Sequence, residues 1–146
     1  MVKSKSINMG FLDDSLGYQL RRAQLAVFND FAENCRSIGT SAGLFSIVTI
    51  VFNNPGLTQS AIAKALGIDR SAMVAAIDKL EAKGLIERRK TENDRRSYAL
   101  FVTDQGNDWY QQALTQVEQH EAGLYMDLSE QEKQFLVGFL SKLAKR

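Results

Sequence analysis

The stretch LTQSAIAKALGIDRSAMVAAIDKLEAKGLIERRKTENDRRSYALFVT, residues 57–103, decides the fold. Thr58 predicts the start of a helix, because its hydroxyl can accept from free backbone N–H groups. Gly67 predicts the end of that helix, since the residue after a helix often needs a positive φ. Asp69 is a favoured N-cap for a second helix, which Gly84 ends. Two helices joined by so short a turn indicate a helix-turn-helix.

The second helix has two faces of opposite character. Met73, Ile77 and Leu80 share one face and are expected to pack against Ile62 and Leu66 of the first helix. The other face is short-chained and basic near its start, which suits a helix that enters the major groove from its N-terminal end. The residues of the two helices predicted to contact DNA are Thr58, Gln59, Arg70, Ser71, Ala72, Ala75 and, on phosphate, Lys79.

A charged hairpin follows. Leu85–Lys90 and Ser97–Thr103 predict two strands joined by the polar turn Thr91–Asp94. Five basic residues flank this turn, and a basic ribbon beside a reading helix would reach phosphates or an adjacent minor groove. A solvated hairpin end is the alternative, but the adjacent helix-turn-helix favours DNA. The hairpin residues predicted to contact DNA are Arg88, Arg95 and Arg96.

Three segments resemble the MarR-type regulators: LEAKGLIER (80–88), DRRSYALFVT (94–103) and TDQG (103–106). The resemblance implies a winged helix-turn-helix that reads an inverted repeat in duplex DNA as a homodimer, with both chain ends interleaved across a two-fold axis. It further implies that Arg96 enters the minor groove and that Asp94 shapes the tip of the hairpin. Ala75 departs from the family, because many members carry a basic or longer polar residue there, so base readout by this helix is thinner.

Apolar periodicity predicts four further helices around this unit. They span about 12–37, 41–53, 104–125 and 129–144. Ser129 and Glu132 form the capping box that opens the last helix.

The fold class expected is therefore mostly α with a small β-wing: a winged helix-turn-helix flanked by N- and C-terminal dimerisation helices. One domain of residues 1–146 is expected, with the DNA-binding part at 57–103. Residues 11–37 and 104–146 are assigned to dimerisation, because their apolar stripes exceed what a lone winged unit can cover.

Charge is distributed unevenly along the chain. The net charge is only +1, but residues 57–103 hold nine Lys or Arg against six Asp or Glu, a net of +3. Residues 104–132 hold seven acidic residues and no Lys or Arg, so this part would repel DNA. No signal peptide and no apolar run of the ~20 residues that a spanning helix needs is evident, which predicts a cytoplasmic protein without membrane contact.

The single cysteine, Cys35, excludes an internal disulfide. Its predicted place near a helix C-terminus disfavours a reactive thiolate, so a structural thiol is expected over a redox sensor. His120 has Gln and Glu neighbours and is predicted to lie on the surface. The sequence shows no nucleophile elbow, glycine-rich phosphate loop or metal-ligand spacing, so neither an enzyme nor a metal or cofactor is expected.

A small-molecule effector is a further implication of the resemblance. The segment LGYQLRRAQ (16–24) is similar to the first helix of family members that respond to aromatic acyl-CoA thioesters. Arg21 and Arg22 could hold a carboxylate or phosphates, or could instead form surface or interface ion pairs. Tyr18, Phe45 and Trp109 could line an aromatic pocket, or could belong to the core.

These patterns lead to one principal hypothesis: a homodimeric repressor that is released from DNA by a small aromatic acid or its CoA thioester. One alternative is a winged-helix module that binds proteins and not DNA, which the acidic C-terminal helices favour and the wing arginines oppose. A second alternative is a repressor switched by oxidation of Cys35.

Overall fold

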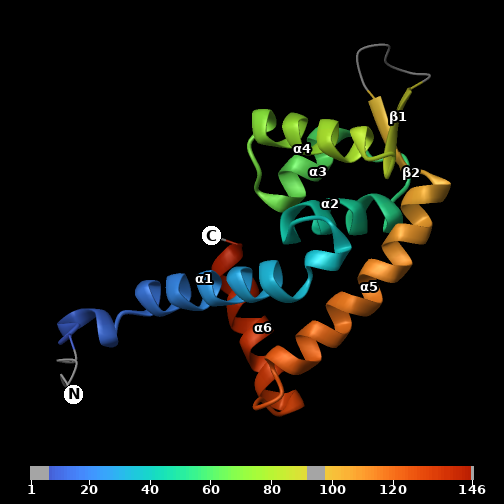
Figure 1. Ribbon diagram of the computed structural model, residues 1–146. Coiled ribbons are helices and arrows are strands. Elements are labelled where there is room, and N and C mark those ends of the chain that lie inside the picture. The colour runs from blue at the N-terminus through green and yellow to red at the C-terminus, as the bar shows by residue number, and fades with distance from the viewer. Residues whose placement is uncertain (1–6, 92–97, 146) are drawn as a thin grey trace.

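The computed structural model describes residues 7–91 and 98–145. This part of the chain is mostly helical, with one two-stranded antiparallel sheet, as the sequence predicted (Figure 1). The elements are, in chain order, α1 (Leu16–Asn34), α2 (Ala42–Asn53), α3 (Gln59–Leu66), α4 (Arg70–Ala82), β1 (Ile86–Lys90), β2 (Tyr98–Val102), α5 (Asp104–Leu124) and α6 (Glu130–Ala144).

The elements form two regions (Figure 1). A winged unit gathers α2, α3, α4 and the hairpin at one end of the molecule. From the wing, α5 runs the length of the molecule to α6, while α1 extends away from the winged unit and crosses in front of α6. None of these helices is long and apolar enough to cross a membrane, among the residues that the structure describes.

Each of the six α-helices that the structure describes begins after a side-chain cap. In each case a hydroxyl or carboxylate oxygen accepts a hydrogen bond from a backbone N–H of the first turn, which satisfies a group that the helix itself leaves unpaired. The capping residues are Ser15, Ser41, Thr58, Asp69, Thr103 and Ser129. The predicted starts at Thr58 and Asp69 and the capping box of Ser129 with Glu132 are thereby confirmed.

The first predicted helix is shorter than expected. In place of one helix over 12–37, α1 is preceded by a 3-10 turn at Gly10–Asp13 and followed by another at Arg36–Ile38. Ser15 is extended and caps α1, which separates the first turn from the helix. At the other end the backbone leaves the α conformation at Cys35, and Gly39, with φ +69°, ends the segment.

The helix-turn-helix packs as its pattern predicted. Ile62 of α3 and Met73, Ile77 and Leu80 of α4 are fully buried in one core cluster, and Leu66 is half-buried against it. Further apolar residues come from α2, β1 and β2, so α4 lies on a core that most of the winged unit shares.

β2 lies between β1 and a third extended segment. The hairpin register pairs Ile86 with Val102 and Lys90 with Tyr98. On its other side, Leu100 donates to the carbonyl of Leu57 and accepts from Gly56, both at 2.9 Å. β1 is therefore the outer strand of the hairpin.

The first turn of α5 packs against Gly84 and Leu85, which follow the C-terminal end of α4. The hydroxyl of Thr103 donates to the carbonyl of Gly84 at 2.5 Å and accepts from the N–H of Gly106 at 2.9 Å. A Cβ on Gly106 would lie 1.9 Å from the carbonyl oxygen of Leu85. The glycine of the TDQG segment is thus required by the close approach of two backbones.

Apolar side chains remain exposed along α6 and at Phe11 and Leu16. No residue of α6 is buried. Phe135 and Phe139 of this helix are 58% and 62% exposed, and their rings stack on each other. Phe11 and Leu16, near the N-terminal end of α1, are 81% and 64% exposed. Isolated exposed apolar residues are ordinary, but several apolar side chains exposed along one helix, as on α6, mark a binding surface.

Candidate nucleic-acid and effector sites

The exposed surface of α4 carries half of the ten residues predicted to contact DNA. Arg70, Ala72, Ala75 and Lys79 are all exposed there. The small side chains leave the helix backbone accessible, while Arg70 at the first turn and Lys79 further along supply positive charge. This is the arrangement that a helix needs to enter a major groove by its N-terminal end.

Ser71 has a second role at the same helix end. One carboxylate oxygen of Asp69 accepts from the N–H of Ser71 at 2.9 Å, from its hydroxyl at 2.6 Å and from the N–H of Ala72 at 3.0 Å. The Ser71 hydrogen bond is the largest cause of the lowered pKa of Asp69. The hydroxyl of Ser71 therefore uses its proton inside the cap, and it can meet DNA only as an acceptor.

The start of α3 lies beside the start of α4. Thr58 is half-buried and caps α3 by accepting from the N–H of Ala61 at 3.3 Å. Gln59 and Arg70 line one shallow hollow between the two helices. The structure thus brings Gln59 next to Arg70, while Thr58 acts first as a cap.

Arg88 of the wing has surroundings that differ from those expected. Arg88, predicted to contact DNA, is turned toward α4, where its guanidinium pairs with Asp78 and Glu81. The guanidinium nitrogens that a phosphate contact would need are thus already bonded to these carboxylates, which favours a different role for Arg88. Asp94, Arg95 and Arg96 lie outside the described residues.

The five predicted effector residues do not line one pocket. The guanidinium carbon of Arg22 lies over the ring of Tyr18, 5.9 Å from the ring centre. Trp109 donates from its indole N–H to the carbonyl of Ile38 at 2.9 Å and packs between two core clusters, which is the core alternative. Arg21 and Phe45 line two separate hollows.

These two hollows adjoin each other along α1. The larger, of about 690 Å³, lies between α1 and α6 and includes Arg21. The smaller, of about 200 Å³, lies between α1, α2 and α5 and is lined by aromatic rings that include Phe31 and Phe45. Phe28 and Tyr125 line both, so the two spaces share a wall. Burial, with the charge of Glu121, raises the pKa of Tyr125, which keeps its hydroxyl protonated as a donor.

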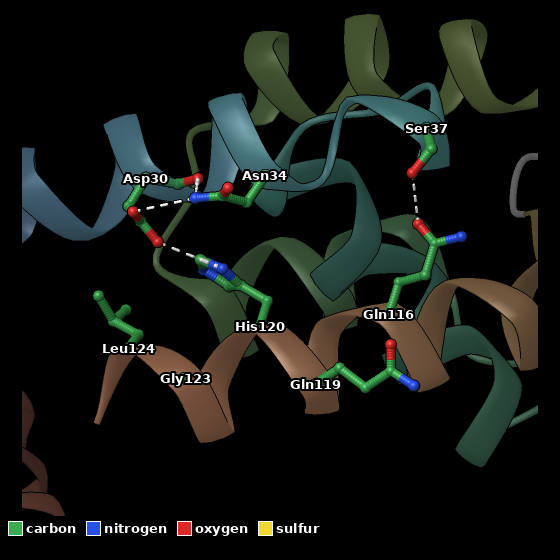
Figure 2. Close-up of a pocket in the computed structure, with 8 residues that line it drawn as sticks. All are labelled: Asp30, Asn34, Ser37, Gln116, Gln119, His120, Gly123 and Leu124. Carbon is green, nitrogen blue, oxygen red and sulfur yellow. Dashed lines mark hydrogen bonds and ion pairs between the residues drawn. The ribbon is translucent and has the colours of Figure 1, made fainter. Parts of the chain in front are cut away.

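A third, polar hollow of about 640 Å³ lies between α1 and α5 (Figure 2). Asn34 donates to Asp30 at 3.0 Å, and Ser37 donates to Gln116 at 2.6 Å. Figure 2 shows that the first pair lies along α1, that the second joins Ser37 to α5, and that His120 reaches from α5 to Asp30. These side chains are already partnered with one another, which fits a contact between helices.

His120 is not the surface residue that the sequence predicted. Its side chain is only 7% exposed, pairs with Asp30 and meets the ring of Phe31 edge-on, with the ring centres 5.8 Å apart. Helical spacing could have predicted this burial, because Ala113, Val117, His120 and Leu124 lie on one face of the helix. The polar neighbours of His120 in sequence belong to other faces of α5.

Cys35 is a buried thiol. It is 1% exposed, in a small cluster with Phe31 and Ile38. Burial raises its pKa, and the charge of Asp30 raises it further. Burial and the raised pKa both favour the protonated thiol, which agrees with a structural role for Cys35. No group of three or more potential metal ligands occurs within residues 7–91 and 98–145.

Comparison with known proteins places this geometry in a family. The MarR family model matches residues 41–98. A putative transcriptional regulatory protein for the hcr operon of Thauera aromatica is 38% identical over 142 residues, covering 94% of this chain and 83% of the relative.

Two solved structures of the transcriptional repressor CouR are similar over nearly the whole chain. CouR bound to a 23-mer DNA duplex has a TM-score of 0.91 and 37% identity, covering 96% of this chain and 99% of CouR. CouR bound to p-coumaroyl-CoA has a TM-score of 0.88 and 34% identity, with 97% and 99% covered.

The chain belongs to the MarR family and is a transcriptional regulator with a winged helix-turn-helix.

Proposed function

We propose that the chain acts as a homodimeric repressor, which binds an inverted repeat in duplex DNA and is released by an aromatic acid or its CoA thioester. The observation that carries the proposal is the structural similarity, over nearly the whole chain, to CouR, which has been solved both on a DNA duplex and with p-coumaroyl-CoA. Such a repressor works in the cytoplasm and needs no catalytic step.

The open apolar face supports the homodimer. The exposed side chains of α6, with Phe11 and Leu16 near the start of α1, would be removed from water by a second copy. A two-fold axis also presents two copies of α4, as an inverted repeat with half-sites about one helical turn apart requires.

The adjoining hollows support an aromatic thioester as effector. The smaller hollow, with Phe31, Phe45 and Tyr125, suits the aromatic acyl group. The larger hollow leads away from it along α1 and carries Arg21, a guanidinium that can hold a carboxylate or the phosphates of CoA. Arg22, which lies over Tyr18 instead, is the less favoured of the two arginines.

The alternatives have less support. A module that binds proteins and not DNA does not account for the exposed, short-chained face of α4 with Arg70 and Lys79. Redox control needs an accessible thiolate, and Cys35 is buried with a raised pKa.

Selection of bound duplexes from a random DNA pool, with and without p-coumaroyl-CoA or related aromatic acyl-CoA compounds, tests the proposal. Enrichment of an inverted repeat that is lost in the presence of one of these compounds is the expected result. Failure to enrich any sequence would reject DNA reading. Enrichment that no aromatic acid or thioester alters would reject the effector class alone.

A further inference from the structure

Arg88 connects the wing to the reading helix. It lies in the middle of β1, yet its guanidinium reaches Asp78 and Glu81, both on α4. The Nη2–Oδ1 distance to Asp78 is 2.5 Å. The Nη1 and Nη2 atoms of the guanidinium thus hold two carboxylates that are about one turn apart on the helix.

The backbone of Arg88 takes part in the same contact. Arg88 pairs with Leu100, whose N–H and C=O both point to the segment at Gly56 and Leu57. Arg88 and Leu100 therefore form a non-hydrogen-bonded pair, and the N–H of Arg88 points outward from β1. Glu81 accepts from this N–H at 3.4 Å, so one carboxylate meets both the backbone and the side chain of Arg88.

The contact is partly shielded from water. The side chain of Arg88 is 20% exposed, whereas those of Asp78 and Glu81 are 58% and 41% exposed. Burial alone would lower the pKa of Arg88, but the hydrogen bonds and charges of Asp78 and Glu81 raise it above its ordinary value. The guanidinium remains charged, with a fixed fork geometry that a lysine cannot reproduce.

We propose that Arg88 is a positioning residue: it makes no contact with DNA, and with Asp78 and Glu81 it fixes the angle between the wing and α4. The inference rests on the proposed DNA binding and assigns a specific role within it. When the angle is fixed before binding, the major-groove helix and the wing engage the duplex together without a further cost of ordering.

The proposal reverses an ordinary electrostatic expectation. Asp78 lies on the same side of α4 as Ser71, about two turns further along, and so brings a negative charge toward the DNA-facing side. Removal of such a charge normally strengthens DNA binding, because less repulsion opposes the phosphates. If Asp78 and Glu81 hold the wing in place, neutralising them weakens DNA binding instead.

The test compares four variants of the full chain on the selected operator across a salt series. They are Arg88→Gln, Arg88→Lys, the double variant Asp78→Asn with Glu81→Gln, and Glu87→Gln as the control. Glu87 is a matched control, since it pairs with Arg89 inside β1 and does not reach α4. Circular dichroism melting and dimer mass establish that each variant is folded.

Arg88→Gln, Arg88→Lys and the double acidic variant should each weaken binding by about fivefold, with an unchanged salt slope. Glu87→Gln should leave binding unchanged or tighter. Tighter binding by the acidic double variant would overturn the proposal. The proposal would also be overturned if Arg88→Lys bound as tightly as the native protein and Arg88→Gln reduced the salt slope by about 0.9 per protomer. Those two results together indicate a phosphate contact. A native protein that binds no duplex would reject the proposed function, whereas these variant results bear on Arg88 only.

Discussion

The Nδ1 atom of His120 lies 3.2 Å from a carboxylate oxygen of Asp30, and this pair joins α5 to α1. The imidazole also packs edge-on against Phe31, so one side chain makes a polar and an aromatic contact between the two helices. The pair stands between the polar hollow and the smaller aromatic hollow, since His120 lines both. A change at His120 should therefore affect stability.

Replacement of His120 by alanine should lower the free energy of unfolding by about 1–3 kcal/mol, through a lost hydrogen bond and a cavity beside Phe31. Urea denaturation at one fixed protein concentration measures this change, because the stability of a dimer depends on concentration. Gln119→Ala is the control: Gln119 is exposed on the neighbouring face and should cost less than about 0.5 kcal/mol. Equal costs at the two positions would show that the His120 contact contributes nothing specific.

Gly106→Ala should destabilise the protein strongly. The added methyl group would lie 1.9 Å from the carbonyl oxygen of Leu85, and that oxygen belongs to the backbone and cannot move away alone. We expect a loss of about 3 kcal/mol or more, or a failure to fold, in thermal melts. Gly123→Ala is the matched control on the same helix, where an added Cβ meets nothing within 4 Å and alanine should gain up to about 1 kcal/mol. Similar melting temperatures for both variants would contradict the close approach at Leu85.

The elements could be predicted from the sequence because their signals are local. Caps such as Thr58, Asp69 and Ser129 act within one turn, and a stripe such as Met73, Ile77 and Leu80 needs only helical spacing. The break before Ser15 could not be predicted from apolar spacing, because the spacing of residues 12–37 continues across it.

What the sequence could not show about the candidate sites concerns partners that are distant in the sequence. In the sequence Arg88 is one more basic residue of the hairpin, and only the fold brings its guanidinium to Asp78 and Glu81 of α4. His120 depends on Asp30, ninety residues earlier in the chain. The effector residues chosen for their type are similarly separated by the fold, with Trp109 held on Ile38 and Arg21 placed beside α6.

The thiol of Cys35 should react slowly with iodoacetamide in the native protein. Burial raises its pKa, so the rate should rise only when the pH passes above the ordinary thiol value of about 8.5. Because the folded thiol keeps its proton to a higher pH than the unfolded thiol, its contribution to stability is fully present below the unfolded pKa and is lost as the pH rises from that value through the raised, folded pKa. Mass spectrometry of labelled protein, with urea-unfolded protein as the reference, measures the rate. Rapid labelling at neutral pH, with DNA binding altered by peroxide, would support the redox alternative instead.

Arg21→Ala should weaken the response to an anionic effector more than it weakens DNA binding. Arg21 lines the hollow between α1 and α6, and loss of one charge-assisted contact should raise the effector concentration needed for release by roughly tenfold. Arg22→Ala is the matched control, because Arg22 lies over Tyr18 on the neighbouring face. Fluorescence anisotropy of labelled operator, titrated with an aromatic acyl-CoA, gives both quantities. An equal loss for both variants, or none for either, would remove Arg21 from the effector site.

Arg70 and Lys79 should differ in what they contribute to DNA binding. Arg70 is exposed at the first turn of α4, where side chains reach base edges, so Arg70→Ala should cost about 1–3 kcal/mol and relax the choice at one symmetric pair of positions. Lys79 is exposed further along the helix and is expected on phosphate, so Lys79→Ala should weaken all sequences alike and reduce the salt slope by about 1 per contact. Binding to the selected operator and to its single-position variants, across a salt series, separates the two effects. Equal, sequence-blind losses at both positions would show that another face of α4 reads the bases, and no loss at either would favour the protein-binding alternative.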